Sequence, residues 1–161
     1  MVRLWENGVE GRSTEFKGHT APVRHVDFSP NDNGAHVLTA SDDKTAKLWT
    51  VVRSGQQSHR FVRSFAGHTN WVRCARFSPD GDMIATSSDD RTVRLWDPDT
   101  GKEFHAFNEP KGYACHLDWH PSGTCIGVAT TDKKVKVYDV RMLKLQQLYT
   151  THQGPVSQVV N

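Results

Sequence analysis

The sequence predicts an all-β fold in which one unit of short strands repeats along the chain. A phrase of Lys or Arg, an aliphatic residue and an aromatic residue ends at positions 5, 49, 96 and 138 of the 161 residues, in steps of 44, 47 and 42. Between these marks, apolar and polar residues alternate as in half-buried strands, with turn-forming residues about every ten positions. No window has a sustained helical period, so we expect helices to be nearly absent.

Other residues repeat in step with the aromatic. An aspartate precedes it by six positions at Asp43, Asp90 and Asp132. A second phrase, an aromatic residue followed by Ser or His and then Pro, begins at positions 28, 77 and 119 and marks a turn between strands. The repeat length matches the roughly 40 to 45 residues of a four-stranded propeller blade. The repeats therefore predict blades of a β-propeller.

The segment from Gly67 to Asp97, GHTNWVRCARFSPDGDMIATSSDDRTVRLWD, resembles the WD40 repeat at nearly every signature position, and the resemblance covers the whole chain. It implies that each blade has four strands, a to d. In the most regular copy these are expected at 72–77, 83–87, 92–96 and 103–107. We expect a WD40 β-propeller segment of about four blades, part of a seven-bladed ring whose remaining blades are further partners.

The expected parts follow from this frame. They are a blade fragment at 1–17 with strand c at 2–5, a first blade at 18–65, a second blade at 66–107, a third blade at 108–149, and the start of the next blade at 150–161 with a strand a at 156–161.

The resemblance also implies a structural tetrad, in which a loop His, a strand Thr, a turn Asp and the strand-c Trp are linked by hydrogen bonds. The two expected tetrads are His19, Thr39, Asp43 and Trp49, and His68, Thr86, Asp90 and Trp96. A Thr-His-Asp set could also suggest a hydrolase, but a nucleophile is not repeated in every unit at fixed spacing. We expect no catalytic residues and no enzyme activity.

The third blade departs from the tetrad pattern. Pro110 stands where the other blades have His, Val128 where they have Thr, and Tyr138 where they have Trp. A tetrad is not expected there. The blade is expected to rely on packing instead, and its loop at 108–112 is expected to be the loosest on its face.

The segment from Cys115 to Cys125 offers two Cys and two His, a set that could suggest a metal site. Cys115 and His116 are neighbours on an expected strand and so point to opposite faces, while His120 lies in a turn. Four ligands do not converge easily from such positions. No phosphate-binding loop or metalloprotease motif occurs either, so we expect no metal and no cofactor.

In the WD40 pattern the d–a and b–c loops lie on one face, called the top, where members of the family commonly bind partners. The residues expected on this top rim are Pro22, Arg24, Asp42, Trp71, Arg73, Asp89 and Tyr113. Trp, Tyr and Arg are enriched in binding hot spots, whereas ordinary rim residues are the alternative interpretation. The two arginines favour a partner with acidic groups.

Composition excludes several partner classes. Lys and Arg number 20 against 18 Asp and Glu, too balanced for a nucleic-acid-binding surface. No apolar run approaches the roughly 20 residues of a membrane span. Three cysteines without a disulfide spacing fit a reducing compartment, so we expect a soluble, cytoplasmic protein that binds neither nucleic acid nor membrane.

Three phrases, at 72–97, 120–125 and 136–149, resemble most the WD40 family named for the proteome of the centriole. This resemblance implies a non-catalytic structural protein of the cytoskeleton, in centriole or basal-body walls, that stabilises microtubule triplets and binds tubulin and other wall proteins. The alternative is a WD40 substrate receptor or scaffold subunit of a ubiquitin-ligase, signalling or chromatin complex. Both would bind proteins.

Overall fold

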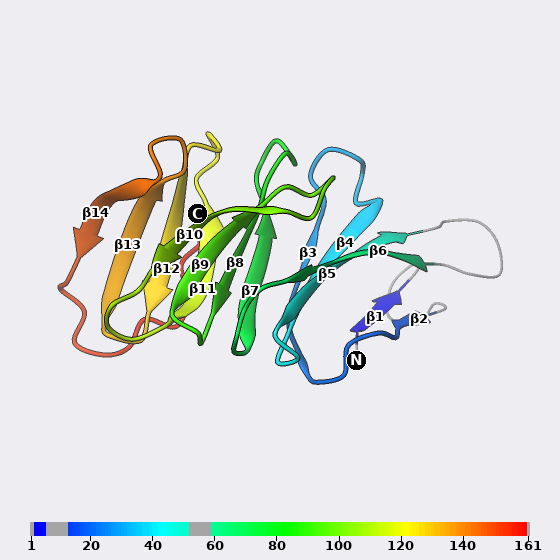
Figure 1. The fold of residues 1–161 in the computed structure, drawn as a ribbon, viewed down its shortest axis with the longest axis horizontal. Coiled ribbons are helices and arrows are strands. Elements are labelled where there is room, and N and C mark those ends of the chain that lie inside the picture. Colours follow the sequence, from blue (N-terminus) through cyan, green and yellow to red (C-terminus); the bar gives the residue numbers. More distant parts are fainter. Residues whose placement is uncertain (1, 6–12, 52–58, 161) are drawn as a thin grey trace.

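A computed structural model describes residues 2–5, 13–51 and 59–160. These residues form three four-stranded antiparallel sheets that stand side by side, and a two-stranded ribbon (Figure 1). No helix occurs in these three ranges, which confirms the all-β prediction. The ribbon contains β1 and β2, the first blade β3 to β6, the second blade β7 to β10 and the third blade β11 to β14. The strands are β1 Val2–Trp5, β2 Ser13–Phe16, β3 Val23–Phe28, β4 His36–Ser41, β5 Thr45–Val51, β6 His59–Ala66, β7 Val72–Phe77, β8 Ile84–Ser88, β9 Thr92–Trp96, β10 Glu103–Asn108, β11 Ala114–Trp119, β12 Cys125–Thr130, β13 Lys134–Asp139 and β14 Lys144–Tyr149.

Apolar side chains fill the space between neighbouring blades. In β8 all five residues are buried, because the flanking sheets cover both of its faces. Leu38 of β4 belongs to the same buried cluster as Val72 and Ile84 of the second blade, and Cys74 to the same cluster as Leu117 of the third. The core therefore lies between the sheets, so each blade depends on its neighbours for burial.

The first strand of each blade has the same irregularity at one end. β3, β7 and β11 are the edge strands of their sheets, and β7 lies against both of the others. The register of each shifts at its second residue, which is Arg24, Arg73 or Cys115. A bulge leaves the extra residue out of the ladder and redirects its side chain. This explains why Arg24 and Arg73 project from the sheet.

The turn between the second and third strands is also repeated. Lys44, Arg91 and Lys133 have positive φ angles of 71°, 69° and 69°, and each directly follows the repeated aspartate. Asp43 Oδ1 accepts a hydrogen bond from the backbone N–H of Thr45, and the corresponding oxygen of the second blade is bonded in the same way. An aspartate that bonds the backbone two residues later favours such a turn. The repeated aspartate therefore fixes the conformation of this turn.

The C-terminal end of the described chain departs from the expected strand pattern. The expected strand at 156–161 is wrong for residues 156–160, which have no strand structure; no described segment pairs with them as a ladder. They do lie against β11, since the Cys115 thiol is 2.8 Å from the carbonyl oxygen of Val156. Of the expected fragment at 1–17, residues 1 and 6–12 lie outside the described part of the chain. No helix of the described residues is long and apolar enough to cross a membrane.

Candidate functional site

Hydrogen bonds link the four residues of the expected tetrad in the first blade. His19 Nδ1 is 2.7 Å from Asp43 Oδ2, and His19 Nε2 is 2.6 Å from Thr39 Oγ1. The Trp49 indole N–H donates to the same Thr39 oxygen over 3.0 Å. The network therefore joins the loop before β3 to strands β4 and β5.

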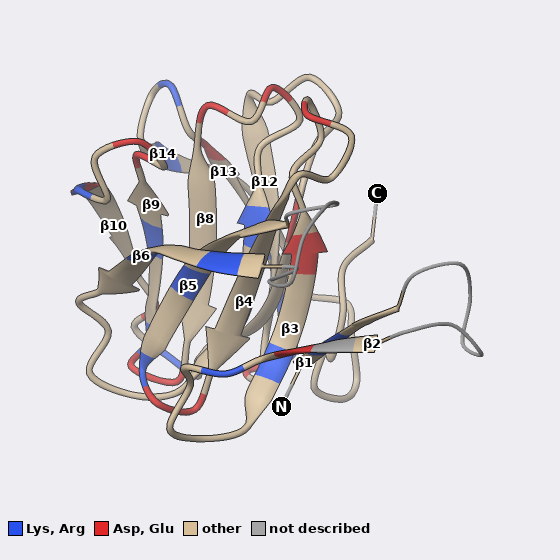
Figure 2. Cartoon of the chain, turned by 90° about the vertical axis from the view of Figure 1, so that its right-hand side faces the viewer, with Lys and Arg blue, Asp and Glu red and all other residues tan. Residues whose placement is uncertain are grey.

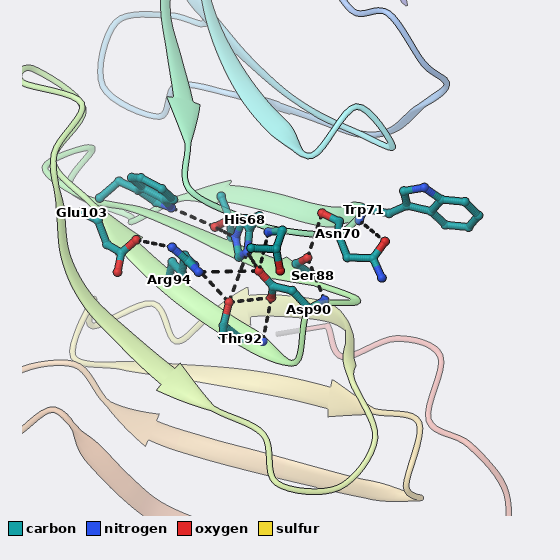
Figure 3. Close-up of polar contacts among 11 residues, drawn as sticks. His68, Asn70, Trp71, Ser88, Asp90, Thr92, Arg94 and Glu103 are labelled. Carbon is teal, nitrogen blue, oxygen red and sulfur yellow. Dashed lines mark hydrogen bonds and ion pairs between the residues drawn. The ribbon is translucent and has the colours of Figure 1, made fainter.

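The second blade repeats this network around His68 and Asp90 (Figure 3). His68 Nδ1 is 2.7 Å from Asp90 and His68 Nε2 is 2.7 Å from Thr86, which accepts the Trp96 indole N–H over 2.8 Å. Burial opposes ionisation of Asp90, but hydrogen bonds, those from His68 and Thr92 foremost, outweigh it and lower the pKa of this carboxyl. Asp90 is therefore ionised at neutral pH.

The threonine hydroxyls of these networks are enclosed. Thr39 and Thr86 are fully buried, and both hydroxyls already contact the histidine and the tryptophan. A hydroxyl that attacks a substrate must reach it, so this geometry fits a structural network rather than a reaction centre.

The third blade contains a different polar network that the sequence analysis missed. Glu109 Oε1 accepts a hydrogen bond of 2.7 Å from the Tyr138 hydroxyl, and Glu109 Oε2 forms an ion pair with Lys136 Nζ. The side chains of Glu109 and Lys136 are 0% and 8% exposed. The expectation that this blade relies on packing instead of a polar network is therefore wrong, and the expected looseness of the loop at 108–112 stays a prediction. Burial and the bond to Glu109 raise the pKa of Tyr138.

Steric fit explains why this blade carries Glu109 where the others have glycine. A Cβ on Gly18 would lie 2.7 Å from Trp49 Cη2, and one on Gly67 would lie 3.0 Å from Trp96 Cη2. The smaller ring of Tyr138 leaves room for a side chain at the equivalent position and supplies a hydroxyl to bond it. Glutamate for glycine and tyrosine for tryptophan are therefore matched changes.

The residues expected on the top rim lie close together around Trp71, and we call the surface that they form the top rim. The Arg73 guanidinium carbon lies 4.9 Å from the Trp71 ring centroid and that of Arg24 5.8 Å, so both cations flank one indole. Arg73 also lies 5.9 Å from the Tyr113 ring. Trp71 is 43% exposed and points away from the tetrad (Figure 3).

Each arginine of the top rim is paired with an aspartate. Arg24 Nε donates to Asp42 Oδ1 over 2.8 Å, and Arg73 Nε donates to Asp89 Oδ1 over 2.7 Å. The bond from Arg24 lowers the pKa of Asp42, so this pair is ionised at neutral pH. The two pairs carry no net charge, which removes the argument for an acidic partner.

The loops that carry the top rim are fixed by one repeated backbone bond. The carbonyl oxygens of Pro22, Trp71 and Tyr113 accept hydrogen bonds of 2.9, 3.0 and 3.1 Å from the N–H groups of Asp42, Asp89 and Thr131. Pro22 itself is exposed. Side chains on such a frame lose little conformational entropy on binding.

Charges of both signs are spread over the molecule. Figure 2 shows basic and acidic residues together on β3 and in turns at both ends of the sheets. This mixture lacks the single-signed surface typical of phosphate-backbone binding.

The two Cys and two His between 115 and 125 are not brought together. The Cys125 thiol contacts Gln146 Oε1 at 3.2 Å, His120 Nδ1 contacts Ser122 at 2.7 Å, and the Cys115 thiol faces Val156. All three cysteines of the chain are free thiols.

Comparison with known proteins agrees with the repeated geometry. The family model described as "WD domain, G-beta repeat" matches residues 11–50, 59–97 and 101–139. The chain belongs to the WD40-repeat family. This WD40 chain is 31% identical over 144 residues to WD repeat-containing protein 1 of Mus musculus, with 88% of the chain and 22% of that protein aligned.

Two other relatives show how widely the WD40 repeat is shared. WD repeat and SOCS box-containing protein 1 of Xenopus tropicalis is 31% identical over 83 residues, which are 52% of this chain and 18% of that protein. Pre-mRNA-processing factor 19 of Mus musculus is 26% identical over 161 residues, 98% of this chain and 30% of that protein. The aligned residues thus span 18% to 30% of the length of these three relatives.

Proposed function

We propose that this WD40 segment is a non-catalytic scaffold that binds another protein through the top rim, with Trp71 as the central anchor. The observation that carries the proposal is a half-exposed tryptophan flanked by two arginines on a hydrogen-bonded frame. Tryptophan and arginine are the residues most enriched among those that dominate binding energy. A WD40 family member is expected to act through such contacts.

Charge narrows the kind of partner. Because Asp42 and Asp89 neutralise Arg24 and Arg73, the rim offers a flat aromatic surface bordered by guanidinium donors, with little net attraction for acidic proteins. It suits a partner that covers Trp71 with an apolar or aromatic side chain and accepts hydrogen bonds at the edge. The two ion pairs then determine the orientation of the bound partner more than its affinity.

For the cellular role, we propose that the protein binds tubulin and other wall proteins in the centriole or basal-body wall and stabilises microtubule triplets there. This finer proposal is supported by the resemblance of the phrases at 72–97, 120–125 and 136–149. A cytoplasmic, cytoskeletal location is part of the same proposal.

A substrate-receptor or scaffold subunit is the second candidate. It is favoured by a relative that carries a SOCS box besides its WD repeats, and by another that is named as a pre-mRNA-processing factor. Both candidates use the top rim, so they differ in location and partner rather than in the contact surface.

Localisation of the full-length tagged protein tests both the centriolar role and the use of the top rim for binding. We expect the unmodified protein at centrioles or basal bodies, and we expect Trp71→Ala to lose this location because an anchor is worth about 2 kcal/mol, roughly 30-fold in affinity. Phe104→Ala is the matched control, since Phe104 is 47% exposed and lies on β10, outside the top rim.

Each outcome has a separate meaning. Diffuse nuclear signal from the unmodified protein would contradict the centriolar role and favour the second candidate. Correct location of Trp71→Ala, or loss of location in Phe104→Ala alone, would contradict the top rim as the binding surface.

A further inference from the structure

Three potential metal ligands meet where the first strands of the three blades adjoin. His25, Cys74 and His116 are each the third residue of their strand, β3, β7 and β11. One donor atom from each lies within 4.8 Å of the other two. The position follows the bulge in every blade, so the same local geometry points these three side chains toward one another.

We propose that His25, Cys74 and His116 form a binding site for one zinc ion that joins the three blades. Two imidazoles and one thiolate are a donor set that zinc accepts and that magnesium and calcium do not. Tetrahedral zinc needs donor separations of about 3.5 Å, so the side chains have to move together by roughly 1 Å. A water molecule is expected to complete the fourth position.

The surroundings of His25 fit the role of a ligand. Its Nδ1 is 3.0 Å from the carbonyl oxygen of Ala75, to which it donates a hydrogen bond. This bond places the proton on Nδ1 and leaves the lone pair of Nε2 for a metal, which is the usual outer contact of zinc-bound histidines. Burial, followed by the charge of Arg76, lowers the pKa of His25 to about 4. The ring is therefore neutral at pH 7.

Competing contacts at the other two ligands are weak. The Cys74 thiol donates to the Leu117 carbonyl oxygen over 3.6 Å, and the Val159 N–H is 3.4 Å from His116 Nδ1. Metal binding replaces this weak thiol bond with a metal–thiolate bond and releases one proton.

The nearby positive charge is balanced. Arg76 opposes a cation at this site, but Asp27 Oδ1 is 3.4 Å from its Nη1 and Asp118 Oδ1 is 3.6 Å from its Nε. Two carboxylates around one guanidinium give this group a net negative charge, which favours a divalent ion close by.

Titration of the tag-free protein with zinc, in competition with a chromogenic chelator, tests the site. We expect one zinc per chain and release of about one proton per ion. Cobalt, used as a coloured substitute, is expected to show a thiolate-to-metal charge-transfer band. Cys74→Ser should abolish this band, and His25→Asn should weaken zinc binding at least about 100-fold.

The matched control is the double variant Cys115→Ser with Cys125→Ser, which removes the two thiols outside the site and should keep both the band and the affinity. Because Cys74 is fully buried, circular dichroism has to show that each variant is folded, and the partly exposed His25 supplies the second test. Absence of stoichiometric zinc binding by the folded protein, or unchanged binding in folded His25→Asn, would overturn the proposal.

Discussion

In the second blade, the loop before the first strand is anchored by His68, whereas in the third blade the same loop is anchored by Glu109. The first anchor is a chain of hydrogen bonds that runs from Asp90 through the histidine to Thr86 and Trp96. The second is a buried ion pair with an added tyrosine hydroxyl. Two unrelated chemistries thus connect the loop to the third strand of the blade.

The third blade lacks the tetrad residues but keeps their role, which is to hold the loop before the first strand against the sheet. Both solutions satisfy every buried partner within the network, which is the condition for burying polar groups at tolerable cost. The two networks differ in the stability that is lost when one partner is removed. A buried lysine without its carboxylate costs more than a neutral group that loses a hydrogen bond.

The largest effect is therefore expected in the blade without the tetrad. Glu109→Ala should lower the free energy of unfolding by about 3 to 5 kcal/mol, because Lys136 would stay buried without the carboxylate that pairs with it. Equilibrium urea unfolding measures the loss. A cost below about 1 kcal/mol would mean that Lys136 reaches solvent without strain.

The fit between glycine and tryptophan can be tested in the first blade. Gly18→Ala should cost about 1 to 3 kcal/mol, because the new Cβ would lie 2.7 Å from the enclosed Trp49 ring. Gly154→Ala is the control, since no atom lies within 4 Å of a Cβ there. Thermal unfolding that ranks the two variants equally would contradict the steric account.

The repeated aspartate should matter unequally in the two blades. Asp90→Ala is expected to cost about 1 to 3 kcal/mol because His68 and the Thr92 hydroxyl lose their acceptor. Asp132→Ala should cost less, since Asp132 contacts Thr130 and Lys134 but no histidine. Denaturant titration compares them directly, and equal losses would argue against the tetrad as the source of the difference.

The smallest effect on stability is expected at the top rim. Trp71→Ala should cost only about 0.5 to 1 kcal/mol, the value of exposed contacts between an aromatic ring and a cation. Calorimetry provides the check. A loss above about 2 kcal/mol would identify Trp71 as a structural residue and weaken its proposed role as an anchor.

Much of the fold could be predicted from residue patterns, because strand alternation, repeated turns and the spacing of the aromatic residue are local signals. The predicted strands at 72–77 and 92–96 agree with β7 and β9. The segment at 156–160 was predicted wrongly because strand structure also requires a hydrogen-bonded partner, which a local pattern does not supply.

The polar networks and the top rim were harder to predict, because some of their contacts join different blades and others involve residues that stand in place of the motif residues. In the sequence, Glu109 shows only that the Gly-His pair of the other blades is missing. The pattern that could have predicted its role is that glutamate replaces glycine in the same blade in which Tyr138 replaces tryptophan. Arg24 and Arg73 pair with the aspartates of the b–c turns because the strand register places the start of each first strand beside the end of the second strand. His25 and Cys74 become neighbours of His116 only when three strands adjoin.

A double-mutant cycle on Glu109 and Lys136 tests most directly whether the third blade replaces the tetrad with an ion pair. The free energies of unfolding of Glu109→Ala, Lys136→Met and the double variant are measured in urea. We predict that the double variant loses at least about 1 kcal/mol less than the two single losses added together, because removal of both charges leaves none buried alone. Additive losses would contradict the ion pair as the anchor of this blade.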